Sequence, residues 1–384
     1  MADPLVRVFA EDGQDTSTFP SRGTWEAPFA TMAFSAADLP SDINNGFNGE
    51  LICKGGEVIE TVPTIVNRSV TIGGIGPALG GFRNGSSIKR NHAGPLIEYD
   101  PAFPNEFEHN VLIHNIKFDG NKSGQPAAEP ILSLHLPGFN TVLFNVRFAD
   151  ASGWGLEVDQ GANSLTAYTL GFSSCALGAM KFESRGAAGD TFGYNVVDIA
   201  GDLQIDECAA VPILIDVNGA SAGQFRSEFT FGNMEFETTS AGVHTTLVQI
   251  DSESTNPLVH VGIRSIMAID SSNGSNKVGV HSSTNASSVT IGMSSLSNEH
   301  THHYKADRAE HNDVLVSDFG QQAPNIIGGG WGNSEPTGMI LGNTRIINVT
   351  GVPSTTEPNG TLALSDNGNG YIRNASTWKL ITIT

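Results

Sequence analysis

The sequence predicts an all-β protein built as a single-stranded, right-handed parallel β-helix, a solenoid in which each turn of the chain stacks on the previous one. Three observations support this prediction. One short pattern recurs at near-constant spacing, a second strand pattern is echoed further along the chain, and the intervals are rich in glycine without helical periodicity. A short N-terminal segment and a small C-terminal β module complete the expected organisation.

The composition agrees with many strands and turns. The 384 residues include 44 glycines, 39% hydrophobic residues and only 16% charged residues, which suffices for a large core but is poor in helix formers. A helix between successive strands, as in a βαβ protein, would need longer and less glycine-rich intervals. An all-β chain is therefore favoured.

The segment 1–48 carries no repeat. Scattered aromatic residues and one short helix around 29–38 are expected there. An open solenoid end exposes core side chains and unpaired strand edges, so a capping element is required. The segment 1–48 is therefore predicted to be an N-terminal attachment or capping segment.

The shaft of the solenoid is expected over residues 49–327. Four pentads alternate apolar and polar residues with period 2, which is typical of strands with one buried face. Their apolar positions are Leu132 and Leu134, Leu156 and Val158, Met180 and Phe182, and Leu203 and Ile205. If each pentad occupies one turn, equivalent residues lie about 4.8 Å apart along the coil.

A second series of strands interleaves with the pentads. The segment at 109–118 is echoed at 139–148, which places Asn115 over Asn145 and Phe118 over Phe148. We expect an amide ladder at a bend from the asparagines and an aromatic ladder from the phenylalanines. A large β-sandwich remains the alternative fold, although sandwich strands seldom repeat at a fixed period.

Residues 328–384 are expected to form a separate C-terminal module with β-hairpins. Glycine and proline interrupt the pattern at 328–343, and the turn sequences PNG and DNGNG separate apolar runs further on. This tail resembles the terminal module of tailed-virus tail spikes and fibres. The matching residues are Pro353, Pro358, Gly360, Tyr371, Trp378 and Lys379.

With its shaft, the chain resembles a receptor-binding tail spike of a bacteriophage or archaeal virus that has a pectate-lyase-like parallel β-helix. The resemblance implies a homotrimer, with residues 328–384 as the trimerisation module, that sits on the virion with other virion proteins. It also implies binding of a host cell-surface glycan or glycoprotein receptor and, in some members, cleavage of the glycan. A glycan depolymerase, either a hydrolase or a lyase, is the second hypothesis, and a structural fibre or capsid decoration is the third.

Candidate chemistry lies on the outward face of the pentad strands. The stacking predicts one column with His135, Asp159, Glu183 and Asp206, and beside it a column with Ser133, Glu157, Lys181 and Gln204. Neighbouring carboxylates repel each other, so Lys181, His135, a bound Ca²⁺ or a retained proton is expected to offset the charge. A solvated acidic face that keeps the shaft soluble is the simpler interpretation.

For an enzyme, Asp159, Glu183 and Asp206 are the catalytic candidates, because adjacent and alternate turns match the carboxyl separations of retaining and inverting glycosidases. A lyase would use Lys181, Arg185 or His135 as its base. Glycan-binding candidates are Glu157, Lys181, His135, Trp154 and Tyr194. Trp25, Tyr168 and Trp331 are further aromatic residues that would stack on sugars if exposed.

His300 and His302 are candidate metal ligands, since they would point the same way on a regular strand and three copies near a trimer axis would supply six imidazoles. A polar loop is the alternative. No cofactor is required by the sequence.

Several classes are disfavoured. The net charge of −20 would repel nucleic acid and anionic membranes. The N-terminus has no secretory signal and no apolar stretch suits membrane insertion, so synthesis in the host cytoplasm is expected. Three separated cysteines predict neither a disulfide framework nor a zinc site, and Cys175 and Cys208 are expected to be buried.

Overall fold

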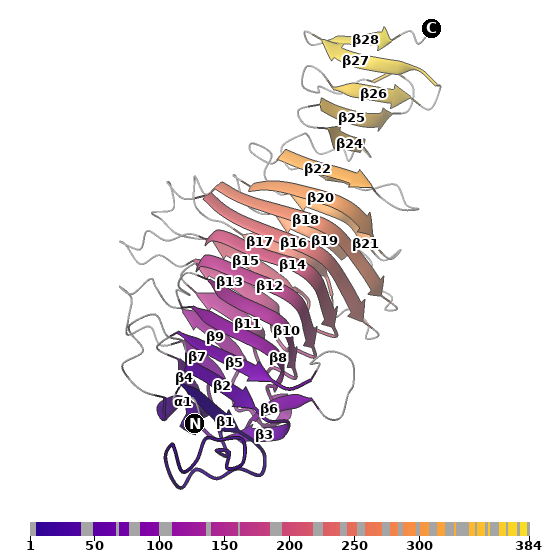
Figure 1. Cartoon of the computed structure of the whole chain (residues 1–384). Coiled ribbons are helices and arrows are strands. Elements are labelled where there is room, and N and C mark those ends of the chain that lie inside the picture. The colour runs from indigo at the N-terminus through magenta and orange to yellow at the C-terminus, as the bar shows by residue number, and fades with distance from the viewer. Residues whose placement is uncertain are drawn as a thin grey trace.

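The chain forms a long coil of parallel strands followed by a small separate sheet (Figure 1). The structure is a computed structural model of all 384 residues. It describes residues 5–39, 49–66, 69–76, 85–99, 110–135, 140–159, 162–184, 194–217, 226–238, 244–251, 258–270, 277–282, 287–296, 300–306, 313–318, 326–327, 338–341, 344–349, 352–353, 361–365, 368–374 and 377–381.

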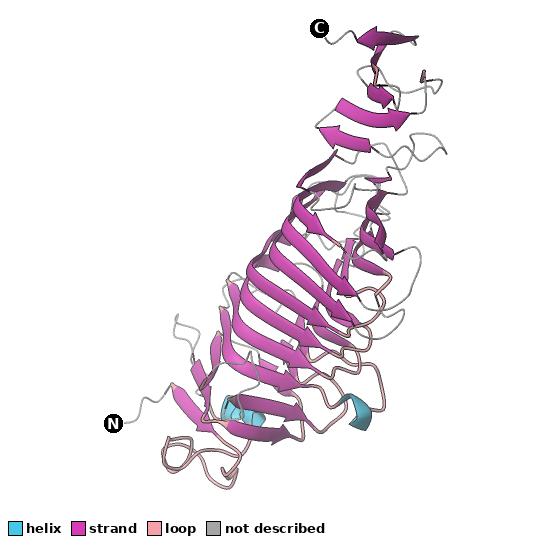
Figure 2. Ribbon diagram, turned by 90° about the vertical axis from the view of Figure 1, so that its right-hand side faces the viewer, coloured by secondary structure: helices cyan, strands magenta, loops and turns pink. Residues whose placement is uncertain are grey.

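One side of the coil is a 13-stranded sheet, sheet A, whose strands lie one above another along the shaft (Figure 2). Its main path contains β1 (Val6–Phe9), β2 (Gly49–Cys53), β5 (Val70–Gly74), β8 (Val111–Asp119), β10 (Thr141–Ala149), β12 (Ala162–Ser173), β14 (Tyr194–Asp206), β16 (Arg226–Thr238), β18 (Leu258–Asp270), β20 (Ser287–Ser295) and β22 (Asp313–Asp318). Two further strands, β3 (Gly56–Glu60) and β6 (Ser86–Arg90), pair with each other, and β6 pairs with β8.

The other side is a 10-stranded sheet, sheet B, which takes one strand from each turn of the chain. It contains β4 (Thr64–Val66), β7 (Ile97–Tyr99), β9 (Leu132–His135), β11 (Trp154–Asp159), β13 (Gly178–Ser184), β15 (Ile213–Val217), β17 (Thr246–Asp251), β19 (Lys277–Ser282), β21 (His300–Ala306) and β23 (Ile326–Ile327).

The fold is a parallel β-helix, as the sequence predicts. The strand pairs described in sheets A and B are all parallel, which excludes the antiparallel β-sandwich alternative. Inward residues of both sheets form one continuous core. In sheet B one inward column runs through Leu132, Leu156, Met180, Ile213, Val248 and Val280.

The predicted asparagine ladder lies at the bend in the long strands of sheet A. Asn115 and Asn145 both have φ of 52°, and the next turn places Thr169 there with φ of 57°. Asparagine tolerates this left-handed conformation better than most residues. The Nδ2 group of Asn145 donates to Oδ1 of Asn115 at 2.8 Å, so the ladder joins two successive turns.

The predicted aromatic ladder is inside the coil. Phe118, Phe148 and Phe172 occupy the same register position on β8, β10 and β12. Their ring centroids are 5.7 Å and 5.0 Å apart, with interplanar angles of 27° and 14°, and all three side chains are buried. We call these three residues the inner ladder.

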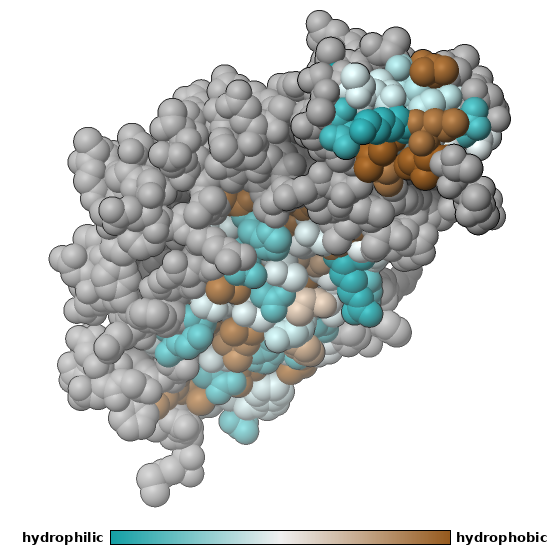
Figure 3. All heavy atoms as spheres, turned by 90° about the horizontal axis from the view of Figure 1, so that it is seen from above, coloured by the Kyte–Doolittle hydropathy of each residue, from teal (hydrophilic) through white to brown (hydrophobic). Residues whose placement is uncertain are grey.

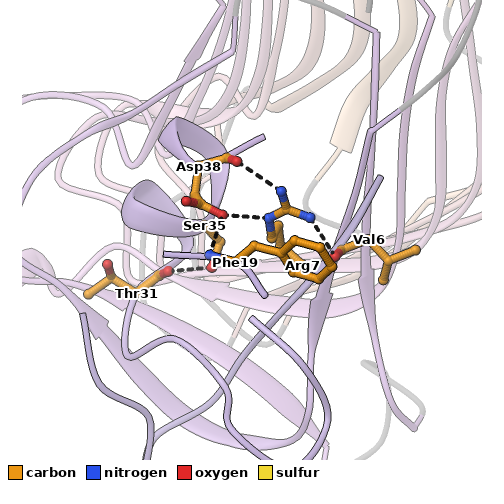
Figure 4. A network of polar contacts seen from close by, with 6 residues as sticks. All are labelled: Val6, Arg7, Phe19, Thr31, Ser35 and Asp38. Carbon is orange, nitrogen blue, oxygen red and sulfur yellow. Dashed lines mark hydrogen bonds and ion pairs between the residues drawn. The ribbon is translucent and has the colours of Figure 1, made fainter. Parts of the chain in front are cut away.

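The N-terminal residues cover the start of the core. The expected helix is α1 (Met32–Ala37), which contacts β1, β2 and β4. In Figure 4, Arg7 on β1 reaches Asp38 after the helix, and the Nε–Oδ2 distance is 2.6 Å. The guanidinium of Arg7 also lies 4.1 Å from the centre of the Phe19 ring. Because β1 pairs with β2, sheet A begins at Val6, earlier than the expected shaft.

At the start of α1, the carboxylate of Glu60 accepts hydrogen bonds from the backbone N–H groups of Met32 at 2.5 Å and Ala33 at 3.3 Å. Glu60 is fully buried, and this burial raises its pKa to about 7. Nearby Asp15 acts in the same direction. The capped end of the solenoid therefore contains a titratable group inside the fold.

Arg90 connects several turns of the chain through hydrogen bonds of its buried side chain. Its guanidinium is fully buried and donates to the carbonyl oxygens of Gly120 at 3.0 Å, Gly94 at 2.8 Å and Pro130 at 3.0 Å. It also donates to the hydroxyl of Ser152 at 2.9 Å. A buried cation requires such a set of acceptors, and these come from corners of different turns.

The C-terminal residues form a five-stranded sheet, sheet C. Its strands are β24 (Gly338–Leu341), β25 (Thr344–Val349), β26 (Leu362–Ser365), β27 (Gly370–Asn374) and β28 (Thr377–Ile381). The DNGNG segment joins the antiparallel pair β26 and β27, as expected for a hairpin. The PNG segment does not join a hairpin, because β25 and β26 are parallel.

Part of sheet C is apolar at its surface. Ala363 and Tyr371 are buried with Trp378 packed against them. Hydrophobic residues reach the surface of this end of the molecule in the view along the coil (Figure 3). In sheet C, Leu364 is 52% exposed and Leu380 is 57% exposed, and these fractions are high for aliphatic side chains.

The fourth pentad was assigned to the wrong sheet. Leu203 and Ile205 lie on β14 in sheet A, where they pair with Leu170 and Phe172. The register column that contains Met180 in sheet B continues instead at Ile213, after a longer turn. The alternation in this segment correctly predicted a strand, but period 2 does not distinguish one parallel sheet from the other.

Candidate functional site

The outward face of sheet B carries two columns of mainly polar side chains, which we call the sheet B columns. The first contains Ser133, Glu157, Lys181, Leu214, Gln249 and His281 in consecutive turns. The second contains His135, Asp159, Glu183, Asp216 and Asp251. The predicted neighbours His135, Asp159 and Glu183 are thus confirmed as register partners.

Asp206 is not part of this face. It lies on β14 in sheet A, paired with Ser173 on one side and Glu237 on the other, and Gln204 lies on the same strand. The prediction that it shares a column with Glu183 is therefore wrong. Asp216, which the repeat pattern did not identify, occupies that position.

Lys181 is the centre of the sheet B columns. Its Nζ lies 2.9 Å from Oε1 of Glu157 on the preceding turn and also contacts Oε2 of Glu183 on its own strand. The side chain of Lys181 is 16% exposed and that of Glu183 only 7% exposed, so the ion pairs are shielded from water. One ammonium thus offsets the repulsion between the carboxylates of Glu157 and Glu183.

The two carboxylates are close because they share this ammonium. Two oxygens that each lie within hydrogen-bonding range of one nitrogen are at most about 6 Å apart. This bound includes the separation of about 5–5.5 Å at which paired carboxyls act in retaining glycosidases. The closeness of Glu157 and Glu183 is therefore compatible with a paired role that the sequence predicts for Asp159 and Glu183.

Beyond the hydrophobic Leu214, the columns continue with hydrogen-bonding groups. Nε2 of Gln249 donates to Oδ1 of Asp251 at 2.7 Å. Nδ1 of His281 lies 2.9 Å from Oε1 of Gln249, so this nitrogen donates to the amide oxygen. The chain therefore presents two polar groups, around Lys181 and around Gln249, on one face.

Trp154 is not an exposed sugar-stacking residue. It is only 9% exposed, and its ring covers Gly178 on the next turn. A Cβ atom at Gly178 would fall 2.1 Å from that ring, so the absence of a side chain there is what admits the tryptophan. The expectation that Trp154 is exposed is wrong.

The remaining candidates are placed by their strands alone. His135 ends β9, and Tyr194 begins β14 in sheet A, away from the sheet B columns. His300 and His302 lie on β21, where an irregularity in the pairing with β19 falls between them. The side chains of these four residues, and the whole of Arg185 and Trp331, lie outside the described residues.

The described residues contain no group of three or more His, Cys, Asp or Glu side chains arranged to hold a metal ion. The region around Lys181 is an ion-paired site. No helix in the described parts of the chain has the length and apolar character needed to cross a membrane. All three cysteines are free and buried.

Asp206 is a separate feature on sheet A. Its partial burial is the main cause that raises its pKa, and the carboxylates of Glu237 and Glu235 add to it. Arg147 acts in the opposite direction. This environment differs from that of Glu183, which forms an ion pair with a lysine.

Comparison with known proteins finds structural likenesses, among them two solved structures. No protein-family model and no curated protein matches the sequence. ORF18 of Geobacillus virus E2 superposes with a TM-score of 0.41 at 12% identity, covering 91% of this chain and 82% of that chain. The DFA-IIIase of Arthrobacter chlorophenolicus A6, solved without its lid, gives a TM-score of 0.35 at 11% identity, covering 81% of this chain and 94% of that chain.

Proposed function

We propose that the protein is a virion surface spike that binds a host cell-surface glycan along the sheet B columns. The observation that carries the proposal is the ion-paired group of Glu157, Lys181 and Glu183, held in a line of polar side chains on one face of a regular coil. Carboxylate and amide oxygens accept hydrogen bonds from sugar hydroxyls. Parallel turns repeat these acceptors along the direction in which a polymer would lie.

The assignment to a virion rests on the solenoid together with the C-terminal residues that resemble a tail-spike module. The same resemblance supports a homotrimer attached to other virion proteins. The mass of the native assembly tests this part directly. A mass of three chains supports the spike, and a strict monomer contradicts it.

Glycan binding is tested with purified host envelope polysaccharide and two variants of the second polar group, Gln249→Ala and Asp251→Asn. These positions avoid the shielded ion pairs, so folding is expected to survive. We expect weaker binding of both variants, because Gln249→Ala removes an amide and Asp251→Asn replaces an accepting carboxylate oxygen with an NH2 donor. Glu57→Gln, an exposed residue of β3, is the matched control and should bind as the wild type does.

A glycan depolymerase is the second candidate, favoured by the closeness of Glu157 and Glu183. Incubation with the same polysaccharide should then yield new reducing ends from a hydrolase or unsaturated products from a lyase. Loss of product in Glu157→Gln or Glu183→Gln, with binding retained, would support catalysis. Binding without product leaves adhesion, and the absence of both favours a structural fibre.

A further inference from the structure

Three aromatic rings lie side by side on the outside of sheet A, at a place that neither the sheet B columns nor the core explains. His114, Phe144 and Tyr168 occupy one register position on β8, β10 and β12. Phe144 is 47% exposed and Tyr168 is 42% exposed, while His114 is half-buried. We call these residues the outer ladder.

The rings of Phe144 and Tyr168 do not stack face to face. The centroids of Phe144 and Tyr168 are 6.4 Å apart, and the ring planes are tilted by 57°. A parallel stack at van der Waals distance, as in the inner ladder, would hide both faces of a middle ring. The tilt and the exposure leave ring surface open to a ligand.

Polar groups border these rings. His114 Nδ1 lies 3.2 Å from the amide Nδ2 of Asn115. Thr166 and Asp198 lie at an adjacent outward register position on β12 and β14. An apolar surface bordered by hydrogen-bonding groups suits a sugar ring, which has C–H groups on its faces and hydroxyls around its edge.

The repeat of the coil suits a sugar polymer. Successive turns are about 4.8 Å apart, which is close to the length of one pyranose unit in an extended glycan. A glycan lying along the shaft would place consecutive rings near consecutive members of the outer ladder. The ligand class that this geometry fits is an uncharged polysaccharide, because stacking rather than ion pairing provides the contact.

A second copy of the chain fits this surface less well. A stable protein interface needs about 20–30 residues on each side with an apolar centre. Beyond β12 the same outward face carries the polar residues Asp198, Glu228, Thr230, His260 and Arg264, and the exposed apolar residues Val196, Met267 and Ile269 lie among them. Charged and polar side chains therefore interrupt the apolar surface, which is continuous only around the outer ladder.

We propose that the outer ladder is a stacking site for the rings of a neutral glycan, separate from the sheet B columns. It rests on the proposed function only in that the ligand is a glycan. The site lies on the opposite sheet, so each can be removed without the other.

The test is affinity electrophoresis of the full chain in gels that contain dextran, amylose or galactomannan. We expect at least one of these to retard the wild type, and the double variant Phe144→Ala with Tyr168→Ala to lose about tenfold or more in affinity. Tyr168→Phe should retain binding because it preserves the ring. Thr230→Ala on the polar part of the same face, and Glu57→Gln on β3, should bind as the wild type does.

Three outcomes would overturn the proposal. They are no retardation of the wild type by any of the three polymers, equal retardation of the double variant, and a change in native mass of the double variant. The last would mean that the outer ladder is covered by a second copy of the chain. Binding of host envelope polysaccharide that depends on Gln249 and Asp251 would leave the proposed function standing in all three cases.

Discussion

The same three strands carry two aromatic ladders, one on each side of sheet A. Inside, Phe118, Phe148 and Phe172 are stacked with interplanar angles of 27° and 14°. Outside, Phe144 and Tyr168 are tilted by 57° and nearly half exposed. Identical backbone spacing thus gives two arrangements, because close packing restricts the inner rings and water does not restrict the outer ones.

This difference separates stability from recognition. Burial of a phenylalanine side chain contributes strongly to folding, whereas an exposed ring gives up that contribution. The inner ladder should therefore control unfolding, and the outer ladder should affect ligand binding with little effect on unfolding. This division can be tested by substituting matched buried and exposed residues. The substitution with the largest expected effect comes first.

Replacing Phe148 by alanine should have the largest effect. The ring is fully buried between two others, so its removal leaves a cavity in the middle of the inner ladder. We expect the free energy of unfolding to fall by about 3–5 kcal/mol, measured by chemical denaturation. Phe144→Ala, on the same strand, should cost under about 1 kcal/mol. Similar losses for the two variants would refute the division.

The same comparison of a buried with an exposed position can be made for cations, beginning with the buried Arg90 and the variant Arg90→Met. Loss of the guanidinium leaves buried carbonyl oxygens without donors, so we expect a loss of about 3 kcal/mol or more in the free energy of unfolding, again by chemical denaturation. Lys117 on the outward face is the matched cation, and its ion pair with Asp119 is 3.4 Å long and partly exposed. Lys117→Met should change stability by under about 1 kcal/mol.

The comparison of buried with exposed side chains also applies to carboxylates. The buried carboxylate of Glu60 should make the free energy of unfolding depend on pH. Its pKa is raised in the folded state to about 7, so its contribution to stability is complete below the unfolded-state pKa and is lost as the pH rises through about 7. Between about pH 4.5 and 8 this amounts to about 3 kcal/mol. Denaturation across that range should show a smaller decline for Glu60→Gln than for the wild type.

The control for this measurement is Glu57→Gln, an exposed residue on the same strand. It should leave the pH dependence of the wild type unchanged. A Glu60→Gln protein with the full wild-type decline would show that the decline arises at other groups.

The asparagine ladder should give the smallest measurable effect. Asn145→Ala removes the hydrogen bond to Asn115 and places alanine at a φ of 52°, so we expect a loss of about 1–2 kcal/mol in the free energy of unfolding. Asn145→Gly removes the same hydrogen bond without the backbone penalty. It should therefore be more stable than the alanine variant, and the reverse order would argue against strain at this bend.

The sequence was sufficient for the fold where side chains repeat at constant spacing. The pairs Leu156 with Met180 and Phe118 with Phe148 are stacked as predicted, because every turn must place an apolar residue at the same inward position. The prediction failed at the longer turn that separates Met180 from its register partner Ile213. A segment from the other sheet then matched the pattern equally well.

The site was less predictable than the fold. Lys181 and Glu157 were adjacent by spacing alone, and the ion pair follows from that. Trp154 was misjudged because its burial depends on a missing side chain at Gly178, a contact that no local pattern indicates. Arg90 was missed for a similar reason, since its acceptors are backbone carbonyls whose positions depend on the completed turns.

The parallel stacking also determines how the length of this protein can change. Since Leu156 lies directly on Met180, the segment that runs from one to the other forms one closed unit that hydrogen-bonds mainly to its two neighbours. Duplicating or deleting such a unit would lengthen or shorten the rod by a single increment of about 4.8 Å and leave both ends intact. The length of the coil can therefore change only in discrete steps of one turn.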